Sequence, residues 1–344
     1  MIRRGFRPWG QLHALLNNTL LTDWAFIGCA SMEERSTAVV RDYRARLSTE
    51  DRLCFQIRDY PSRHQAAADL ATQAHRQVFE ACGFGNRHIL EFQIDEKAGV
   101  LNQSIDEFIG KCRSGNLILD ITSLPKRYFF LILKKVLKSP QFINILVTCG
   151  DPETYSEGKL AEGHLAWAAL PGFNGPIREP EKKKLVIGLG FEPLGLPELY
   201  GTGLFTRSEV HFLLPFPASP EKHRRNWDFL RQLIPVPTGT DIIHRVDASN
   251  VPDSYLQIAK LTDNGATFAQ LAPFGPKGIS LAMCLYACMF VELDELPGVY
   301  YTQPTIYNSE YSKGIKVIDG IPSINAYAVK LAGANLYGRD RLDD

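Results

Sequence analysis

The sequence predicts an α/β protein made of two Rossmann-like lobes, each with a mainly parallel sheet flanked by helices. Short apolar runs suited to buried strands alternate with segments of helical periodicity, which is typical of parallel sheets covered on both faces. A stretch containing several Gly and Pro residues interrupts this alternation near the middle of the chain, and the alternation then restarts. The length of 344 residues also suits two domains.

The first lobe is predicted to span residues 1–150. We expect strands where apolar residues run together and helices where they recur every three or four positions. The expected strands are 24–30, 52–58, 88–93, 117–121 and 143–148. The expected helices are 32–47, 63–82, 101–112 and 126–138.

Residues 151–183 are predicted to connect the lobes, and residues 184–344 to form the second lobe. Its expected strands are 184–190, 209–215, 241–246, 267–273 and 298–304, and its expected helices are 220–233, 252–259 and 279–290. Pro125-Lys126 and Pro276-Lys277 take equivalent places between a strand and an apolar helix. This correspondence is only weak evidence for an internal duplication, because Pro is common in the first turn of any helix.

The charge and hydropathy patterns argue against some classes of protein. The chain has 38 Lys and Arg against 38 Asp and Glu, a formal net charge of zero. A protein that binds duplex DNA through its surface normally has a basic excess, so we expect no such binding. No apolar run reaches the roughly 18 residues of a membrane span, and the N-terminus lacks the features of a secretory signal. We therefore expect a cytoplasmic protein without membrane contact.

The seven cysteines are spread along the chain and form no CxxC motif. Several lie inside apolar strand or helix patterns, so we expect buried free thiols in a reducing compartment. Cys284 and Cys288 share a helical face, but no His or Cys partner at a suitable spacing accompanies them. The eight His residues are dispersed, and we expect no metal and no cofactor.

The loop after the expected strand 117–121 holds the strongest candidates for a ligand site. Ligands of parallel sheets bind beyond the carboxyl ends of the strands. Asp120, Thr122, Ser123, Lys126 and Arg127 gather at this strand end. Hydroxyls followed by a lysine at a helix N-terminus suit the binding of an anion. The alternative is an ordinary turn in which Ser123 caps the helix and Lys126 faces solvent.

The loop after the expected strand 24–30 is the second candidate. Ser31 followed by Glu34 has the pattern of a capping box at a helix N-terminus. Alternatively, Ser31, Glu34 and the loop amides face a ligand, and Arg35 meets its phosphate. Asp120, at the end of an apolar strand, would need a partner for its buried carboxylate, and Arg35 or Lys126 could provide one.

A weaker candidate is Lys277 in the second lobe. It repeats the position of Lys126, and Gly275 and Gly278 beside it would let the backbone approach a ligand closely. A structural turn explains the same residues. The loop lacks the GxxxxGK[ST] pattern of a P-loop.

The segment Asp120-Ile121-Thr122-Ser123-Leu124-Pro125-Lys126 resembles the D-x-[ST]-G-G-T-K signature of CARF domains, the Rossmann-like sensors of cyclic oligonucleotides in prokaryotic antiviral defence. The resemblance implies that this loop and the Ser31 loop contact a nucleotide-like ligand. The chain differs from the signature at Ser123, Leu124 and Pro125. A side chain as large as Leu124 would obstruct the approach of backbone to a phosphate. Because both lobes use up the chain, the resemblance also implies a separate effector protein.

Three functions follow as hypotheses. The first is a sensor or binding subunit for a nucleotide-type anion in a prokaryotic defence system, acting through a separate effector as a homo- or hetero-oligomer. The second is a metal-independent enzyme that acts on a nucleotide or cyclic oligonucleotide, like the ring nucleases. Glu33, Glu34 or Asp120 would be its general base, and Lys126 would stabilise the developing charge. The third is a non-catalytic scaffold subunit of a complex.

Overall fold

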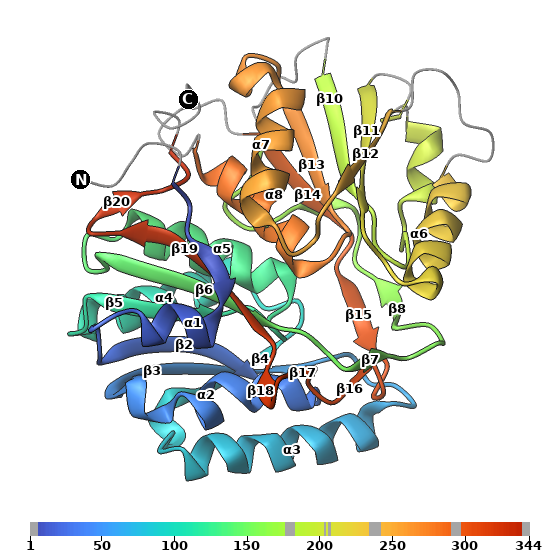
Figure 1. Ribbon diagram of the computed structural model, residues 1–344. Coiled ribbons are helices and arrows are strands. Elements are labelled where there is room, and N and C mark those ends of the chain that lie inside the picture. The colour runs from blue at the N-terminus through green and yellow to red at the C-terminus, as the bar shows by residue number, and fades with distance from the viewer. Residues whose placement is uncertain are drawn as a thin grey trace. The chain divides into compact units, whose positions relative to one another are not determined.

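The structure, a computed structural model, describes residues 6–175, 183–202, 204–205, 208–233, 242–289 and 297–338. Two compact lobes divide the chain (Figure 1). The first lobe comprises Phe6–Glu162 and Thr305–Leu336, and the second is formed mainly by Gly163–Pro304. Both are α/β units with mainly parallel sheets flanked by helices, which confirms the predicted fold class.

The first lobe is built on one sheet with the strand order β1-β19-β6-β5-β2-β3-β4, and β20 pairs with β19. The strands from β6 to β4 are parallel to one another, whereas β19 and β1 run antiparallel to their neighbours. The strands of this sheet are β1 (Trp9–Gln11), β2 (Trp24–Ala30), β3 (Leu47–Arg58), β4 (Ile89–Gln93), β5 (Asn116–Asp120), β6 (Asn144–Gly150), β19 (Ile324–Leu331) and β20 (Ala334–Asn335).

Helices cover both faces of this sheet. The α2 and α3 helices lie together on one face, and α4 and α5 lie together on the other (Figure 1). The α-helices are α1 (Leu12–Asn17), α2 (Ala38–Asp42), α3 (Gln65–Ala81), α4 (Ala98–Lys111) and α5 (Lys126–Lys138). The 3-10 turns are η1 (Glu34–Thr37), η2 (Arg44–Arg46) and η3 (Asn86–His88). Short strands complete the lobe: β7 (Thr154–Tyr155), β16 (Ser312–Lys313), β17 (Val317–Ile318) and β18 (Ile321–Pro322).

The two elements that hold the candidate site have clear signals in the sequence. All seven residues of β2 are buried, as the continuous apolar run Trp24–Ala30 predicts for a strand covered on both faces. α5 begins at Lys126, directly after Pro125, and buries Tyr128, Phe129 and further apolar residues against the sheet. Proline suits the start of a helix because its ring would clash with a preceding helical turn and because it has no N–H group that would be left unpaired.

The division of the chain differs from the predicted one, because Thr305–Leu336 belongs to the first lobe. Within this segment, β19 (red in Figure 1) lies beside β6 (green) and pairs with it, with Ala326 opposite Thr148. The prediction assigned these residues to the second lobe because the partner of a strand is not encoded by its neighbours in sequence. Of the predicted connection 151–183, residues 176–182 lie outside the described part of the chain.

Lys330 ties β19 to the helix layer of the first lobe. A β-bulge between Ala328 and Lys330 shifts the register against β6. The Lys330 ammonium donates to the carbonyl oxygens of Ser139, at 2.8 Å, and Leu137, at 3.4 Å, at the C-terminus of α5. A cation is favourable there because the last carbonyls of a helix carry a partial negative charge.

Replacing Lys330 by methionine should lower the free energy of unfolding by about 1–2 kcal/mol. The variant loses charge-assisted hydrogen bonds and leaves buried carbonyls unpaired, and removing a buried charge offsets part of this loss. Urea denaturation would measure the change. Lys138→Met, at the exposed last residue of α5, is the matched control and should stay within about 0.5 kcal/mol of the parent protein. Equal stability of the two variants would contradict this role of Lys330.

The second lobe has the strand order β12-β11-β10-β13-β14-β9, parallel except for β9. Its strands are β9 (Ala168–Ala169), β10 (Lys183–Gly188), β11 (Ser208–Pro215), β12 (Ile242–Val246), β13 (Ala269–Pro273) and β14 (Gly298–Tyr301). Its helices are α6 (Pro220–Leu233), α7 (Val251–Leu261) and α8 (Lys277–Met289), with the 3-10 turns η4 (Pro197–Thr202) and η5 (Asp263–Gly265). Two further strands, β8 (Ala161–His164) and β15 (Pro304–Tyr307), pair where the lobes meet in sequence.

The parallel parts of the two sheets have the same topology. The order β12-β11-β10-β13-β14 of the second lobe matches β4-β3-β2-β5-β6 of the first when strands are compared in chain order. Lys277 begins α8 after β13, as Lys126 begins α5 after β5. The correspondence that the sequence suggests between Pro125-Lys126 and Pro276-Lys277 therefore holds in the topology.

Candidate functional site

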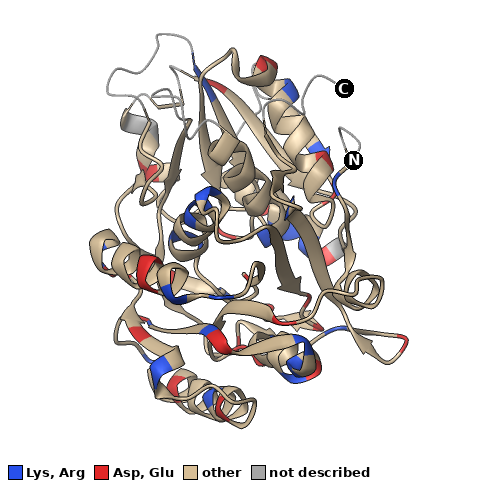
Figure 2. Ribbon diagram, turned by 90° about the vertical axis from the view of Figure 1, so that its left-hand side faces the viewer, with Lys and Arg blue, Asp and Glu red and all other residues tan. Residues whose placement is uncertain are grey.

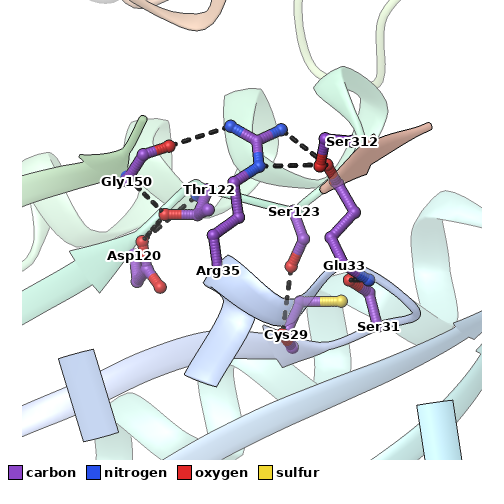
Figure 3. Close-up of polar contacts among 9 residues, drawn as sticks. All are labelled: Cys29, Ser31, Glu33, Arg35, Asp120, Thr122, Ser123, Gly150 and Ser312. Atoms are coloured by element: carbon purple, nitrogen blue, oxygen red, sulfur yellow. Dashed lines mark hydrogen bonds and ion pairs between the residues drawn. The ribbon is translucent and has the colours of Figure 1, made fainter. Parts of the chain in front are cut away.

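The candidate site lies in the first lobe, where the order of the strands reverses. From β2 the chain continues to β3 and β4 on one side, and from β5 it continues to β6 on the other. β2 and β5 are neighbouring strands, and the loops that follow them lead to opposite faces of the sheet. The hydroxyl of Ser123, after β5, donates to the carbonyl oxygen of Cys29, in β2, at 3.0 Å (Figure 3). Ligands of open α/β sheets bind outside such a switch point.

Asp120 ends β5 and is only 2% exposed. Its Oδ1 accepts hydrogen bonds from the Thr122 amide at 3.2 Å, the Thr122 hydroxyl at 2.5 Å and the Thr148 hydroxyl at 3.2 Å. Burial raises the pKa of Asp120 to about 6 from an ordinary 3.8, although these hydrogen bonds and Arg35 act to lower it. The carboxyl group is therefore held by hydroxyls and an amide, whereas Arg35 and Lys126 were the partners considered from sequence.

Thr122 connects Asp120 to the end of the neighbouring strand. Its hydroxyl accepts a hydrogen bond from the Gly150 amide, at 2.8 Å, at the end of β6. With that lone pair occupied, the hydroxyl proton is directed to Asp120. The Thr122 side chain is thus buried and satisfied, and it positions the Asp120 carboxyl group rather than facing solvent.

Arg35 reaches the same strand ends from the other loop and is only 4% exposed. Its Nε and Nη2 donate to one carboxylate oxygen of Glu33, at 3.0 and 2.7 Å, and its Nη1 donates to the Gly150 carbonyl at 2.8 Å (Figure 3). The same Glu33 oxygen accepts the Ser312 hydroxyl, from β16. Burial alone would lower the pKa of Arg35, but the Glu33 carboxylate raises it well above its ordinary value. Arg35 thus forms a buried ion pair within the lobe, and its predicted phosphate contact stays a prediction.

The capping box predicted for Ser31 and Glu34 does not form. The Ser31 hydroxyl accepts from the Glu33 amide at 3.2 Å, and its carbonyl oxygen bonds to His75 Nδ1 at 2.7 Å. A serine turn of this kind satisfies the amide two residues on, so the helical turn starts later, at Glu34. Glu34 is exposed, and the predicted helix 32–47 is broken into η1, α2 and η2.

The N-terminus of α5 has no side-chain cap. Pro125 takes the N-cap position and makes no side-chain cap hydrogen bond. Leu124 is fully buried, so its side chain belongs to the core and does not cover the loop. Lys126 is half-buried at the first helical position. Arg127 donates to the Glu96 carbonyl at 2.9 Å, so its guanidinium is held by the loop after β4.

The corresponding switch point of the second lobe is closed by its own backbone. A Cβ on Gly190, after β10, would overlap the carbonyl oxygen of Phe274, and a Cβ on Gly275 would crowd that of Leu189. These glycines let the two loops approach each other closely, and a ligand contact of Lys277 stays a prediction. Lys277 lies beside these loops, in the other lobe from Asp120 and Lys126.

Sequence reasoning did not predict the roles of four residues that complete the first-lobe arrangement. Thr148 and Gly150 end β6, and their place at a strand end was a usable signal. Glu33 was weighed only as a general base, and the spacing to Arg35 gave no reason to pair them. Ser312 had no signal, because it arrives through β16, which pairs with β7 far away in sequence.

Within the described residues, no group of three or more His, Cys, Asp or Glu is placed to hold a metal ion. The described cysteines are all free and buried. Lys and Arg are interspersed with Asp and Glu along the helices in the view of Figure 2. Among the helices described, none combines the length and the hydropathy needed to cross a membrane.

Comparisons with known proteins give little further guidance. No protein-family model matches the chain, and no curated protein matches it. Among solved structures, it is similar to a proposed universal stress protein from Pseudomonas aeruginosa UCBPP-PA14, with 11% identity over 83% of this chain and 96% of that one. A functionally unknown protein from Pseudomonas aeruginosa PAO1 also has 11% identity, over 81% and 92% of the chains. Both TM-scores are 0.23, and similarity at this level gives no information about function.

Proposed function

We propose that the first lobe binds a nucleotide-type anionic ligand at the carboxyl ends of β2 and β5, and acts as a sensor or binding subunit. The observation that carries the proposal is the position of the Asp120–Lys126 loop at the topological switch point of a doubly wound parallel sheet. This is the place where open α/β sheets bind their ligands. The involvement of a separate effector and of antiviral defence rests on the CARF resemblance alone.

The start of α5 supports an anionic ligand. Its N-cap residue, Pro125, makes no side-chain cap hydrogen bond, and a helix N-terminus carries a partial positive charge. Lys126, at the first helical position, adds a cation to the same place. Helix N-termini with these properties are common binding sites for phosphate groups.

The Asp120 carboxyl group favours a second candidate function, a metal-independent enzyme. A buried carboxyl group with a pKa of about 6 suits a general base that works near neutral pH. Turnover of a nucleotide that is lost in Asp120→Asn while binding persists would favour the enzyme over the sensor.

The first experiment is mass spectrometry of small molecules released from the purified protein, followed by calorimetric titration with mononucleotides, dinucleotides and cyclic oligonucleotides. A nucleotide that is released or that binds supports the proposal. Complete absence of binding across this panel, with a protein partner that still copurifies, would instead support a scaffold subunit.

Replacing Lys126 by alanine should weaken binding of the nucleotide identified in this way by about 1–3 kcal/mol, because a charge-assisted hydrogen bond is lost. The fold should persist, since Lys126 is only half-buried. Lys138→Ala, at the other end of α5 and exposed, is the matched control and should bind as the parent protein does. The same affinity in both variants would refute the placement of the anion at the start of α5.

A further inference from the structure

The Asp120 carboxyl group uses its two oxygens very differently. All three hydrogen bonds of this side chain go to Oδ1. Two come from Thr122, which Figure 3 shows beside Asp120, and one comes from the Thr148 hydroxyl. Oδ2 accepts none from any described residue. Oδ2 is not fully enclosed by the protein, so part of the slight exposure of this side chain lies at this oxygen. The donors around Oδ1 fix the plane of the carboxyl group and leave Oδ2 open to a ligand.

An open oxygen on a buried carboxylate is costly for the protein alone. A nearly enclosed polar atom without a hydrogen bond from the protein loses most of its hydration and gains little in return. Arg35, whose charge acts on Asp120, also pairs with Glu33 and the Gly150 carbonyl. The Asp120 carboxyl group is ionised above its raised pKa of about 6, and an ionised Oδ2 can only accept a hydrogen bond.

We propose that Asp120 Oδ2 accepts a hydrogen bond from a sugar hydroxyl of the ligand, while the ligand's phosphate is bound at the start of α5. The inference rests on the proposed function and narrows its ligand to a ribose-containing nucleotide. A phosphate group against Oδ2 would meet like charge, whereas a hydroxyl supplies the missing donor. Asp120 would then bind the sugar hydroxyl, and Lys126, at the other end of the same loop, would bind the phosphate.

Asn at position 120 gives a decisive variant because its orientation is dictated by the surrounding donors. The amide oxygen must take the place of Oδ1, since the Thr122 and Thr148 groups donate there. The amide nitrogen then takes the place of Oδ2 and presents donors where the carboxylate presented an acceptor. The packing stays the same, and the group that faces the ligand is inverted.

The test compares the ribonucleoside 5′-monophosphates of adenine, guanine, cytosine and uracil with their 2′,3′-dideoxy analogues, by calorimetric titration. The parent protein should bind at least one ribonucleotide about tenfold or more tightly than its dideoxy analogue. Asp120→Asn should reduce this difference by weakening the ribonucleotide alone, because an amide N–H can donate to a sugar hydroxyl only in a weaker, uncharged hydrogen bond. Lys126→Ala should weaken both forms by the same factor. Circular dichroism would verify that each variant is folded.

Each other result overturns the inference in a recognisable way. Equal binding of both forms to the parent protein, with both weakened by Lys126→Ala, would remove the hydroxyl contact and leave the proposed function standing. Tighter binding of both forms to Asp120→Asn would show that Oδ2 faces the phosphate. Absence of binding by every probe, together with no nucleotide released from the purified protein, would overturn the proposed function and this inference with it.

Discussion

Replacing Arg35 by methionine is expected to lower the free energy of unfolding of the first lobe by about 3–5 kcal/mol. The variant would leave the Glu33 carboxylate largely buried with only the Ser312 hydroxyl as a partner. The Gly150 carbonyl oxygen would also lose the hydrogen bond that Arg35 donates to it. Removing one member of a buried ion pair is costly because the other charge stays out of water without compensation.

Arg41 offers a matched control for Arg35 in the adjoining helix. It pairs with Asp42 at 2.9 Å, but its side chain is 44% exposed, so Arg41→Met should cost about 1 kcal/mol or less. The double variant Glu33→Gln with Arg35→Met should recover part of the loss, since no buried charge is left. Urea denaturation gives the free energies, and hydrogen exchange in β2 and β5 assigns the loss to the first lobe. A cost for Arg35→Met no greater than for Arg41→Met would refute the importance of the buried pair.

Replacing Asp120 by asparagine is expected to stabilise the protein at pH 8, by up to about 3 kcal/mol. The pKa of Asp120 is raised to about 6 in the folded protein from 3.8, and two pKa units correspond to roughly that free energy. A raised carboxyl pKa means that the folded state holds the proton more tightly. The contribution of Asp120 to stability is therefore full below pH 3.8 and is lost as the pH rises through about 6.

Asparagine keeps an acceptor for Thr122 and Thr148 and never ionises, so it avoids this loss. The advantage of the variant should shrink steadily when thermal or urea denaturation is repeated between pH 8 and pH 4. Asp69→Asn, on the exposed part of α3, should change stability by less than about 0.5 kcal/mol at either pH. If Asp120→Asn destabilised the protein at pH 8, the buried carboxylate would have a structural role. Stabilisation would instead show that this carboxylate is kept at the expense of stability, as functional groups often are.

Much of the fold was predictable because its strands carry local signals. The runs that became β2, β5 and β6 are continuous and apolar, and α5 begins and ends at the residues that its periodicity and Pro125 indicate. The prediction of a helix at 32–47 was wrong because the Ser31 turn and the short 3-10 turn η1 occupy the residues of its expected first turns. β19 was not predictable as part of the first lobe, since the register that joins it to β6 exists only after folding.

For the candidate site, the sequence predicted where in the sheet the residues lie but not which side chains hydrogen-bond to one another. Asp120, Thr122, Ser123 and Arg35 meet at the ends of β2, β5 and β6, as the rule for parallel sheets implies. Which donor serves which acceptor depends on side-chain direction, and here hydroxyls, not cations, hold Asp120. Whether Ser31, Lys126 and Arg127 contact a ligand stays a prediction.

The late position of β19 in the chain has a consequence for synthesis on the ribosome. β6 leaves the ribosome well before its antiparallel neighbour, because the residues of the second lobe lie between them. Until Ile324–Leu331 emerges, the nascent first lobe presents β6 as an unpaired edge with free N–H and C=O groups. Such edges are templates for aggregation. Completion of the first lobe therefore has to wait for the second to be translated, and truncated or stalled chains would be the ones that depend most on chaperones.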